Sequence, residues 1–229
     1  MAITELPSSE AYFNTSLPCG TAVFVGCENG SVYVWRVAFS YFKGKEPMIV
    51  PISIFQAFNG TPVQTIAVES SVNDKDCSRI VTGSCHTLNE EKGGQGEVKL
   101  WDISELLTVQ SGDELKKPVL LKMKARHEIA IALLHSDRKE WNFGIKALAY
   151  SPDNAYIAVG FGLPTYLSGA GVFLGAVVRN ETLETACVID GENYQLHYLE
   201  FDKNYSNGET YRLLISTPYT FEVCLITPS

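Results

Sequence analysis

The residues of this sequence that could do chemistry are scattered along the chain. The glycine-rich run Gly93-Gly-Gln-Gly96 could suggest a phosphate-binding loop, but it lacks a following Lys-Ser/Thr pair and no helix follows it. Cys77, Cys85 and His86 could donate to a metal, yet tetrahedral zinc needs four ligands and a fourth is not evident. We therefore predict a hairpin tip at the glycine run, with no metal and no cofactor.

Acid–base and nucleophilic catalysis have no better support. The carboxylate pairs Glu90-Glu91 and Asp74/Asp76 fall in polar segments, where no neighbour in the sequence would desolvate one member and shift its pKa. A Gly-x-Ser-x-Gly nucleophile elbow is absent, so an α/β-hydrolase is unsupported. The prediction is that this protein is not an enzyme.

Composition excludes several other classes. Of the 229 residues, 45% are hydrophobic and 11% aromatic, which indicates a folded core and not a disordered chain. The net charge is −8, with 18 Lys and Arg against 26 Asp and Glu, so nucleic acid and anionic membranes are poor partners. No window approaches the roughly 18 apolar residues that would span a bilayer, and no signal peptide is visible.

The six cysteines are too sparse for a disulfide scaffold and form no CxxC pair, so we predict free thiols in a reducing compartment. Together with the lack of a leader, this predicts a cytoplasmic protein.

Alternating apolar and polar residues, rich in β-branched and aromatic types, predict an all-β chain. Asn29-Gly30 is a strong hairpin signal between the first two of these runs. One turn of helix is expected at Ser104-Glu-Leu-Leu, and Arg126–Leu134 is ambiguous between helix and strand, with strand favoured. The predicted strands are Thr21–Gly26, Ser31–Val37, Pro51–Phe58, Pro62–Val68, Arg79–Gly83, Glu97–Ile103, Pro118–Lys124, Gly144–Tyr150, Ala155–Gly160, Gly171–Val178, Thr185–Ile189, Gln195–Phe201, Tyr211–Ser216 and Thr220–Ile226.

The strands repeat as four units. A small residue closes one strand of each unit, at Gly26, Gly83, Gly160 and Ser216, and a turn and a partner strand follow. The partner strands beginning at Gly30, Gly96 and Phe221 align position for position. The predicted units span 11–50, 51–117, 118–184 and 185–229.

The motifs of these units resemble WD40 repeats. Lys99-Leu-Trp-Asp-Ile103 is similar to the end of a repeat, and Ala147–Gly160, which contains Ser-Pro-Asp-Asn, is similar to its middle. The resemblance implies about four antiparallel four-stranded blades of a β-propeller, each apolar on both faces and stacked on its neighbours. It also implies a non-enzymatic scaffold for protein–protein interaction, whose partners bind rim loops.

The anchors expected in such loops are large side chains in predicted turns, namely Tyr41, Phe42, Arg138, Trp141 and Tyr166. An alternative from the enzyme class, a propeller with a catalytic site in its central channel, could draw only on His135 and His197.

A finer resemblance joins His135–Glu140, Ile145–Asp153 and Phe221-Glu-Val-Cys-Leu225 to echinoderm-microtubule-associated-protein-like (EMAP-like) propellers. It implies a microtubule- or tubulin-binding protein. The lysines of 116–126, which alternate with Leu and Met, could then meet an acidic tubulin tail, although a strand with one wet face explains them as well.

Four blades are fewer than the seven of a ring that needs roughly 300 residues. Three explanations stay open: the chain is part of a larger propeller, which we favour; a partner or second copy completes it; or residues 1–19 close a small ring. The first unit also lacks an evident innermost strand, unless 11–17 supplies it.

Overall fold

The structure is a computed structural model of the chain. It describes residues 2–5, 20–38, 48–69, 78–84, 96–107, 115–125, 144–162, 174–190, 196, 198–206, 209–216 and 220–228. Fifteen strands and one helical turn, α1 (Ser104–Leu107), lie within these residues, which confirms the all-β prediction and the single turn of helix.

The strands form four antiparallel sheets, each hydrogen-bonded in chain order. The first contains β1 (Ala2–Glu5), β2 (Gly20–Gly26), β3 (Ser31–Ala38) and β4 (Met48–Gln56). The second contains β5 (Val63–Val68), β6 (Arg79–Ser84), β7 (Glu97–Asp102) and β8 (Val119–Ala125). The third contains β9 (Gly144–Tyr150), β10 (Tyr156–Gly162), β11 (Leu174–Arg179) and β12 (Thr185–Asp190). The fourth contains β13 (Tyr198–Ser206), β14 (Tyr211–Ser216) and β15 (Phe221–Ile226).

The sheets differ in their bounds from the predicted units 11–50, 51–117, 118–184 and 185–229. In each of the first three sheets the outermost strand, β4, β8 or β12, pairs with the strand before it, whereas the prediction placed most of it in the following unit. Alternation identifies a strand but not the neighbour with which it pairs. The innermost strand of the first sheet is β1, which pairs with β2; the segment 11–17 lies outside the described residues.

The predicted Asn-Gly turn joins β2 to β3. Gly30 has a φ of 84°, a left-handed conformation that glycine adopts without steric cost. A Cβ added there would lie 2.0 Å from the carbonyl oxygen of Phe58, so the turn also needs glycine for the close passage of the next segment.

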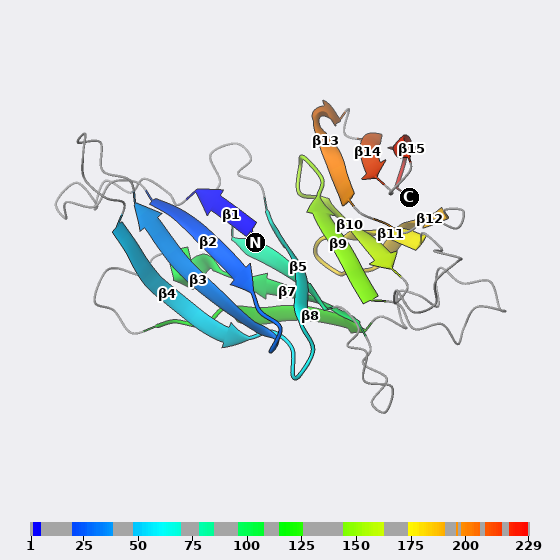
Figure 1. Ribbon diagram of the computed structural model, residues 1–229. Coiled ribbons are helices and arrows are strands. Elements are labelled where there is room, and N and C mark those ends of the chain that lie inside the picture. Colours follow the sequence, from blue (N-terminus) through cyan, green and yellow to red (C-terminus); the bar gives the residue numbers. More distant parts are fainter. Residues whose placement is uncertain are drawn as a thin grey trace.

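The sheets follow one another across the molecule in chain order (Figure 1). The first strands of neighbouring sheets contact one another, β1 with β5, β5 with β9, and β9 with β13, and therefore line the inner side of the arrangement. Three hydrophobic clusters fill the spaces between successive sheets, one at each junction. Stacking thus buries both faces of the second and third sheets.

Candidate interaction surfaces

The predicted rim anchors Tyr41, Phe42, Arg138, Trp141 and Tyr166 lie outside the described residues. So do both histidines of the enzyme alternative, the segment Arg126–Leu134, residues 93–95 of the glycine run, the Cys77–Cys85–His86 group and the two carboxylate pairs, whereas Gly96 is described and buried. Within the described part of the chain, no group of three or more His, Cys, Asp or Glu side chains could hold a metal ion. No helix there has the length and apolar character needed to cross a membrane.

Cys27, Cys187 and Cys224 carry free thiols, as predicted; they lie at or next to strands and are half-buried. Burial raises the pKa of the Cys187 and Cys224 thiols, which disfavours the reactive thiolate.

Each junction between sheets is built around a glycine. A Cβ added at Gly26 would lie 2.5 Å from Val63 Cγ1, and one added at Gly83 would lie 2.5 Å from Ile145 Cγ2. At Gly160 it would lie 2.1 Å from Leu196 Cδ2. In every case the aliphatic side chain comes from the start of the next sheet, so it occupies the space that a larger residue would fill.

The same register recurs at these junctions. In the second sheet the aliphatic residue Val63 pairs with Ser84, a bulge follows, and Thr65 pairs with Gly83. In the third, Ile145 pairs with Phe161, a bulge follows, and Ala147 pairs with Gly160.

In the fourth sheet, Leu196 precedes Tyr198 by two positions, and Tyr198 pairs with Ser216. Ser216 therefore occupies the position of Gly26, Gly83 and Gly160, as the sequence predicted. The partner strand is shifted by two positions from its predicted alignment: because Ser216 pairs with Phe221 and Gly26 pairs with Val32, Phe221 is equivalent to Val32.

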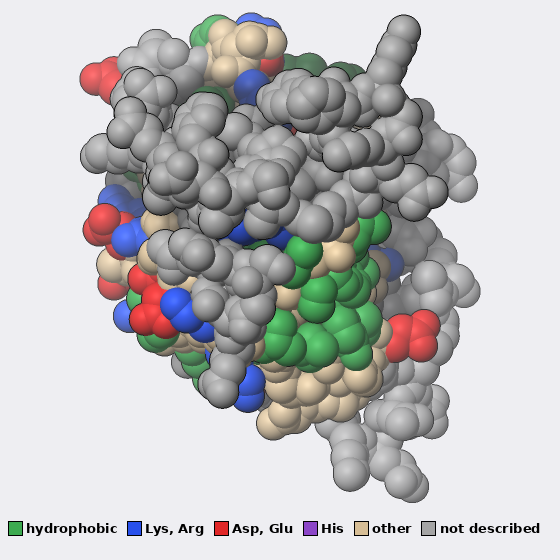
Figure 2. Space-filling view, turned by 90° about the vertical axis from the view of Figure 1, so that its left-hand side faces the viewer, with side chains coloured by type: hydrophobic (Ala, Val, Ile, Leu, Met, Phe, Trp, Pro, Cys, Tyr) green, Lys and Arg blue, Asp and Glu red, His purple; other side chains and the backbone are tan. Residues whose placement is uncertain are grey.

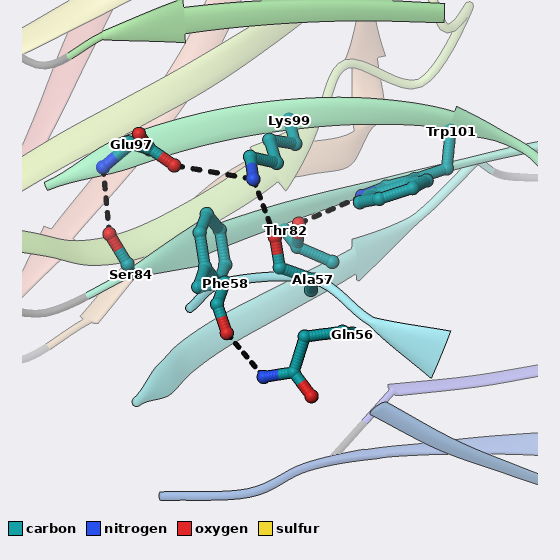
Figure 3. Close-up of polar contacts among 8 residues, drawn as sticks. All are labelled: Gln56, Ala57, Phe58, Thr82, Ser84, Glu97, Lys99 and Trp101. Carbon is teal, nitrogen blue, oxygen red and sulfur yellow. Dashed lines mark hydrogen bonds and ion pairs between the residues drawn. The ribbon is translucent and has the colours of Figure 1, made fainter. Parts of the chain in front are cut away.

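A polar cluster joins the first two sheets (Figure 3). The Lys99 ammonium donates to the carbonyl oxygen of Ala57 at 2.6 Å, lies 3.3 Å from Glu97 Oε2, and sits 4.8 Å from the centre of the Phe58 ring. The Lys99 side chain is only 15% exposed. These contacts satisfy a largely buried cation within the junction, so its chemistry is structural.

Trp101 anchors the same junction. Its ring meets Phe55 of the first sheet edge-on at 5.0 Å between centroids, and its indole N–H donates to Thr82 Oγ1 at 3.0 Å (Figure 3). Both partners of this hydrogen bond belong to the second sheet.

Asp153 connects the third sheet to the fourth. Its carboxylate accepts a hydrogen bond from the Tyr211 hydroxyl at 2.6 Å, and it also accepts from Ser151 and from the Ala155 amide. Burial alone would raise the pKa of the Asp153 carboxyl, but these hydrogen bonds outweigh it and lower the pKa below its ordinary value. The same contact, after burial, raises the pKa of the Tyr211 hydroxyl. Asp153 therefore acts as an ionised clamp across the junction.

The outer face of the fourth sheet differs from every junction. We call it the open face. Phe221, Val223 and Leu225 of β15 are 63%, 51% and 65% exposed, and Tyr198 of β13 is 49% exposed. The register places Leu214, Ser216 and Arg212 on the same face, beside these residues. Their equivalents in the first two sheets are fully buried: Val32, Val34, Val98 and Leu100 are at most 1% exposed.

The outward face of the first sheet, at the other end of the molecule, is the counterpart of the open face, and its aromatic residues are less exposed. Tyr33 and Trp35 stack with 5.6 Å between ring centroids on its outward side and are half-buried. Ile49 and Ile54 of β4 are 61% and 42% exposed. On the side where β1–β4 lie, hydrophobic side chains gather in a patch (Figure 2).

Strand β8 is a third exposed region. It is the outer edge of the second sheet, and Val119, Leu120, Leu121 and Met123 are all more than 40% exposed. Lys122 is exposed beside them, so this strand presents a lysine and apolar side chains to solvent together, and not one polar face alone.

No protein-family model and no curated protein matches the sequence. Among solved structures, the β-propeller domain of Cps50 (Swd1) from Myceliophteria thermophila matches 97% of this chain and 52% of its own, with a TM-score of 0.54 and 8% identity. The chain has the WD40-type β-propeller fold. It spans about half the length of that propeller, and each sheet described above is a blade.

Two further matches have lower TM-scores. The C-terminal WD40 domain of Sif2 matches 98% of this chain and 57% of its own at 14% identity, with a TM-score of 0.40. Chaetomium thermophilum Sqt1, solved bound to the N-terminus of ribosomal protein L10, matches 87% and 55% at 11% identity, with a TM-score of 0.44.

The sequence reasoning found the blade pattern but did not identify the residues of the open face. The strand Phe221-Glu-Val-Cys-Leu225 shows the same alternation as the buried strands. Nothing within that strand distinguishes a covered face from an uncovered one.

Proposed function

We propose that this chain is a non-enzymatic WD40-type scaffold that binds protein partners. The observation that supports it best is the open face, where four large apolar side chains of the last blade are 49–65% exposed. Contiguous exposed apolar surface is typical of interaction sites in soluble proteins. The rim anchors Tyr41, Phe42, Arg138, Trp141 and Tyr166 stay part of this proposal as a second contact region.

Quantitative affinity capture tests the proposal. The full chain should retain a reproducible set of proteins, and a Val223→Asp, Leu225→Asp variant should lose part of it because the charges oppose burial of that face. Val188→Asp is the matched control, since Val188 is also an exposed β-strand valine but lies on the third blade, 42% exposed. An Arg138→Ala, Trp141→Ala variant tests the rim. If the wild-type chain and the three variants all captured the same set of proteins, the result would contradict the scaffold function.

Strand β8 supports a narrower second candidate, an EMAP-like tubulin or microtubule binder. Lys117 and Lys122 are exposed next to apolar side chains, an arrangement suited to an acidic, partly apolar peptide such as a tubulin tail. Co-sedimentation with microtubules should then weaken for Lys117→Glu, Lys122→Glu and as salt rises. Lys203→Glu is the control, because Lys203 is 75% exposed on the fourth blade. No co-sedimentation of the wild-type chain would eliminate this candidate and leave the general one intact.

A further inference from the structure

Strand β8 differs from the outermost strands of the first and third blades. In β4, Ile52 and Phe55 are 2% and 5% exposed, and in β12, Ala186 and Ile189 are 8% and 7% exposed, so each of those strands buries some of its side chains. In β8, all five residues from 119 to 123 are exposed, and four of them are apolar. The position of an outermost strand in a blade therefore does not by itself explain the exposed apolar side chains of β8.

The backbone of β8 has one open edge within the described part of the chain. There, β7 is the only strand that pairs with β8, from Glu97 opposite Ala125 to Asp102 opposite Val119. The other edge of such a strand presents N–H and C=O groups to which a further extended segment can bond. The second blade is flanked by described blades on both sides, so this edge belongs to the interior of the chain and not to its ends.

The register with β7 assigns the side chains of β8 to two sides of the sheet, because opposite residues of a strand pair lie on the same face. Leu120 is opposite Trp101, which contacts the first blade, whereas Lys122 is opposite Leu100, which belongs to the cluster shared with the third blade. Met123 lies on the same side as Leu120, because a bulge between them shifts the alternation by one residue. A segment paired with β8 would thus meet apolar side chains on one face and an ammonium group on the other.

We propose that the outer edge of β8 binds an extended segment of a partner protein as a fifth strand, a segment in which apolar residues alternate with Asp or Glu. Alternation with a period of two places its apolar residues beside Leu120 and Met123 and its carboxylates beside Lys122. Lys117, exposed just before the strand, offers a second cation. This inference deepens the scaffold function proposed above and rests on it.

Charge is the reason to choose an acidic segment over a second copy of this chain. Pairing of two β8 edges would bring Lys117 and Lys122 of both copies into one joint, and like charges across a strand pair are destabilising. The chain as a whole has a net charge of −8, so this lysine-bearing strand is a local exception that suits an acidic partner strand.

A synthetic peptide of seven residues, the length of β8, with Val at its odd positions and Glu at its even positions, tests the proposal. At saturation it should slow amide exchange in β8 of the full chain by about tenfold or more, and leave β12 unchanged. The same peptide with three consecutive N-methylated amides keeps its side chains but loses donors on both edges, so it should not protect β8. A seven-residue poly-glutamate peptide, which carries charge without apolar side chains, should not protect it either.

Variants of exposed residues test the two faces of the edge. Lys122→Glu should weaken binding of the alternating peptide by about tenfold, and Lys122→Arg should retain it. Leu120→Glu should weaken binding by a similar factor, because it places a charge beside the apolar residues of the peptide. Val188→Glu is the matched control on the outermost strand of the third blade, where Val188 is 42% exposed, and it should bind as the wild type does.

Three results would overturn the proposal: unchanged exchange of β8 at about 1 mM peptide, equal protection by the N-methylated or poly-glutamate peptide, and undiminished binding to Lys122→Glu. A stable dimer of the wild-type chain that Leu120→Glu dissociates would also overturn it, by assigning the edge to a second copy. The capture experiment is separate. If strand addition fails, partners that the open face or the rim still captures would retain the scaffold function.

Discussion

The third and fourth blades have the same strand pattern. They differ in that a further blade covers the outer face of the third, whereas no described blade covers that of the fourth. In the third blade, Ala158 and Val177 face the fourth blade and are 0% exposed. In the fourth, the equivalent positions hold Leu214, which is half-buried, and Val223, which is 51% exposed. A propeller blade is therefore apolar on both faces whether or not both faces are covered. Whether a face is covered depends on the presence of a neighbouring blade and not on the residues of the blade itself.

The largest expected effect separates the junction glycines from Ser216. Gly83→Val would force its side chain into Ile145 and Thr65, and we expect it to lower the free energy of unfolding by about 3 kcal/mol or more. Ser216→Val should change it by less than about 0.5 kcal/mol, because no described blade covers that face. Urea unfolding of both variants measures the difference. Comparable losses would mean that the open face is covered.

The next effect compares two valines at equivalent positions. Val34→Ala removes side-chain carbons that are 1% exposed, so it should cost about 2 kcal/mol. Val223→Ala should cost only a few tenths of a kcal/mol, near the limit of urea titrations. If Val223→Ala proved as costly as Val34→Ala, the distinction between the two faces would fail.

Two tryptophans at equivalent positions sharpen the comparison at the other end of the chain. Trp101→Phe loses the bond to Thr82 and part of the contact with Phe55, and should cost about 1–2 kcal/mol. Trp35→Phe should cost less, because Trp35 is half-buried and stacks only on Tyr33 among the described rings. Thermal unfolding of both variants under matched conditions measures the two losses of stability. A larger loss for Trp35→Phe than for Trp101→Phe would contradict the tighter packing around Trp101.

The smallest effect depends on pH. Tyr211→Phe keeps the ring but removes the bond to Asp153, and should cost about 1 kcal/mol near neutral pH. The carboxyl of Asp153 has a folded-state pKa below its ordinary value of 3.8. Its ionised form therefore stabilises the fold above that pH, and the contribution disappears as the pH falls through the lowered pKa.

The wild-type chain and Tyr211→Phe should thus converge in stability as the pH falls below 3.8. A difference that stayed constant down to that range would show that Tyr211 acts through packing alone.

The sequence predicted most of the strands because β-branched alternation and the Asn29-Gly30 turn are local signals. It also located Gly26, Gly83, Gly160 and Ser216, since small residues stand out against aliphatic neighbours. Pairing across blades is a long-range property, so the unit bounds were displaced by one strand. Val63 was likewise assigned to a strand without any indication that it fills the gap at Gly26. Exposure of Phe221 depends on a neighbour outside its own strand, which local patterning does not encode.

Hydroxyl-radical footprinting of the folded chain would compare the two regions most directly, because it labels side chains according to their exposure. Phe221 and Leu225 should be oxidised readily, while Phe24 and Leu100, which are 0% and 1% exposed, should stay protected. Equal protection of Phe221 and Phe24 would contradict an open face on the fourth blade.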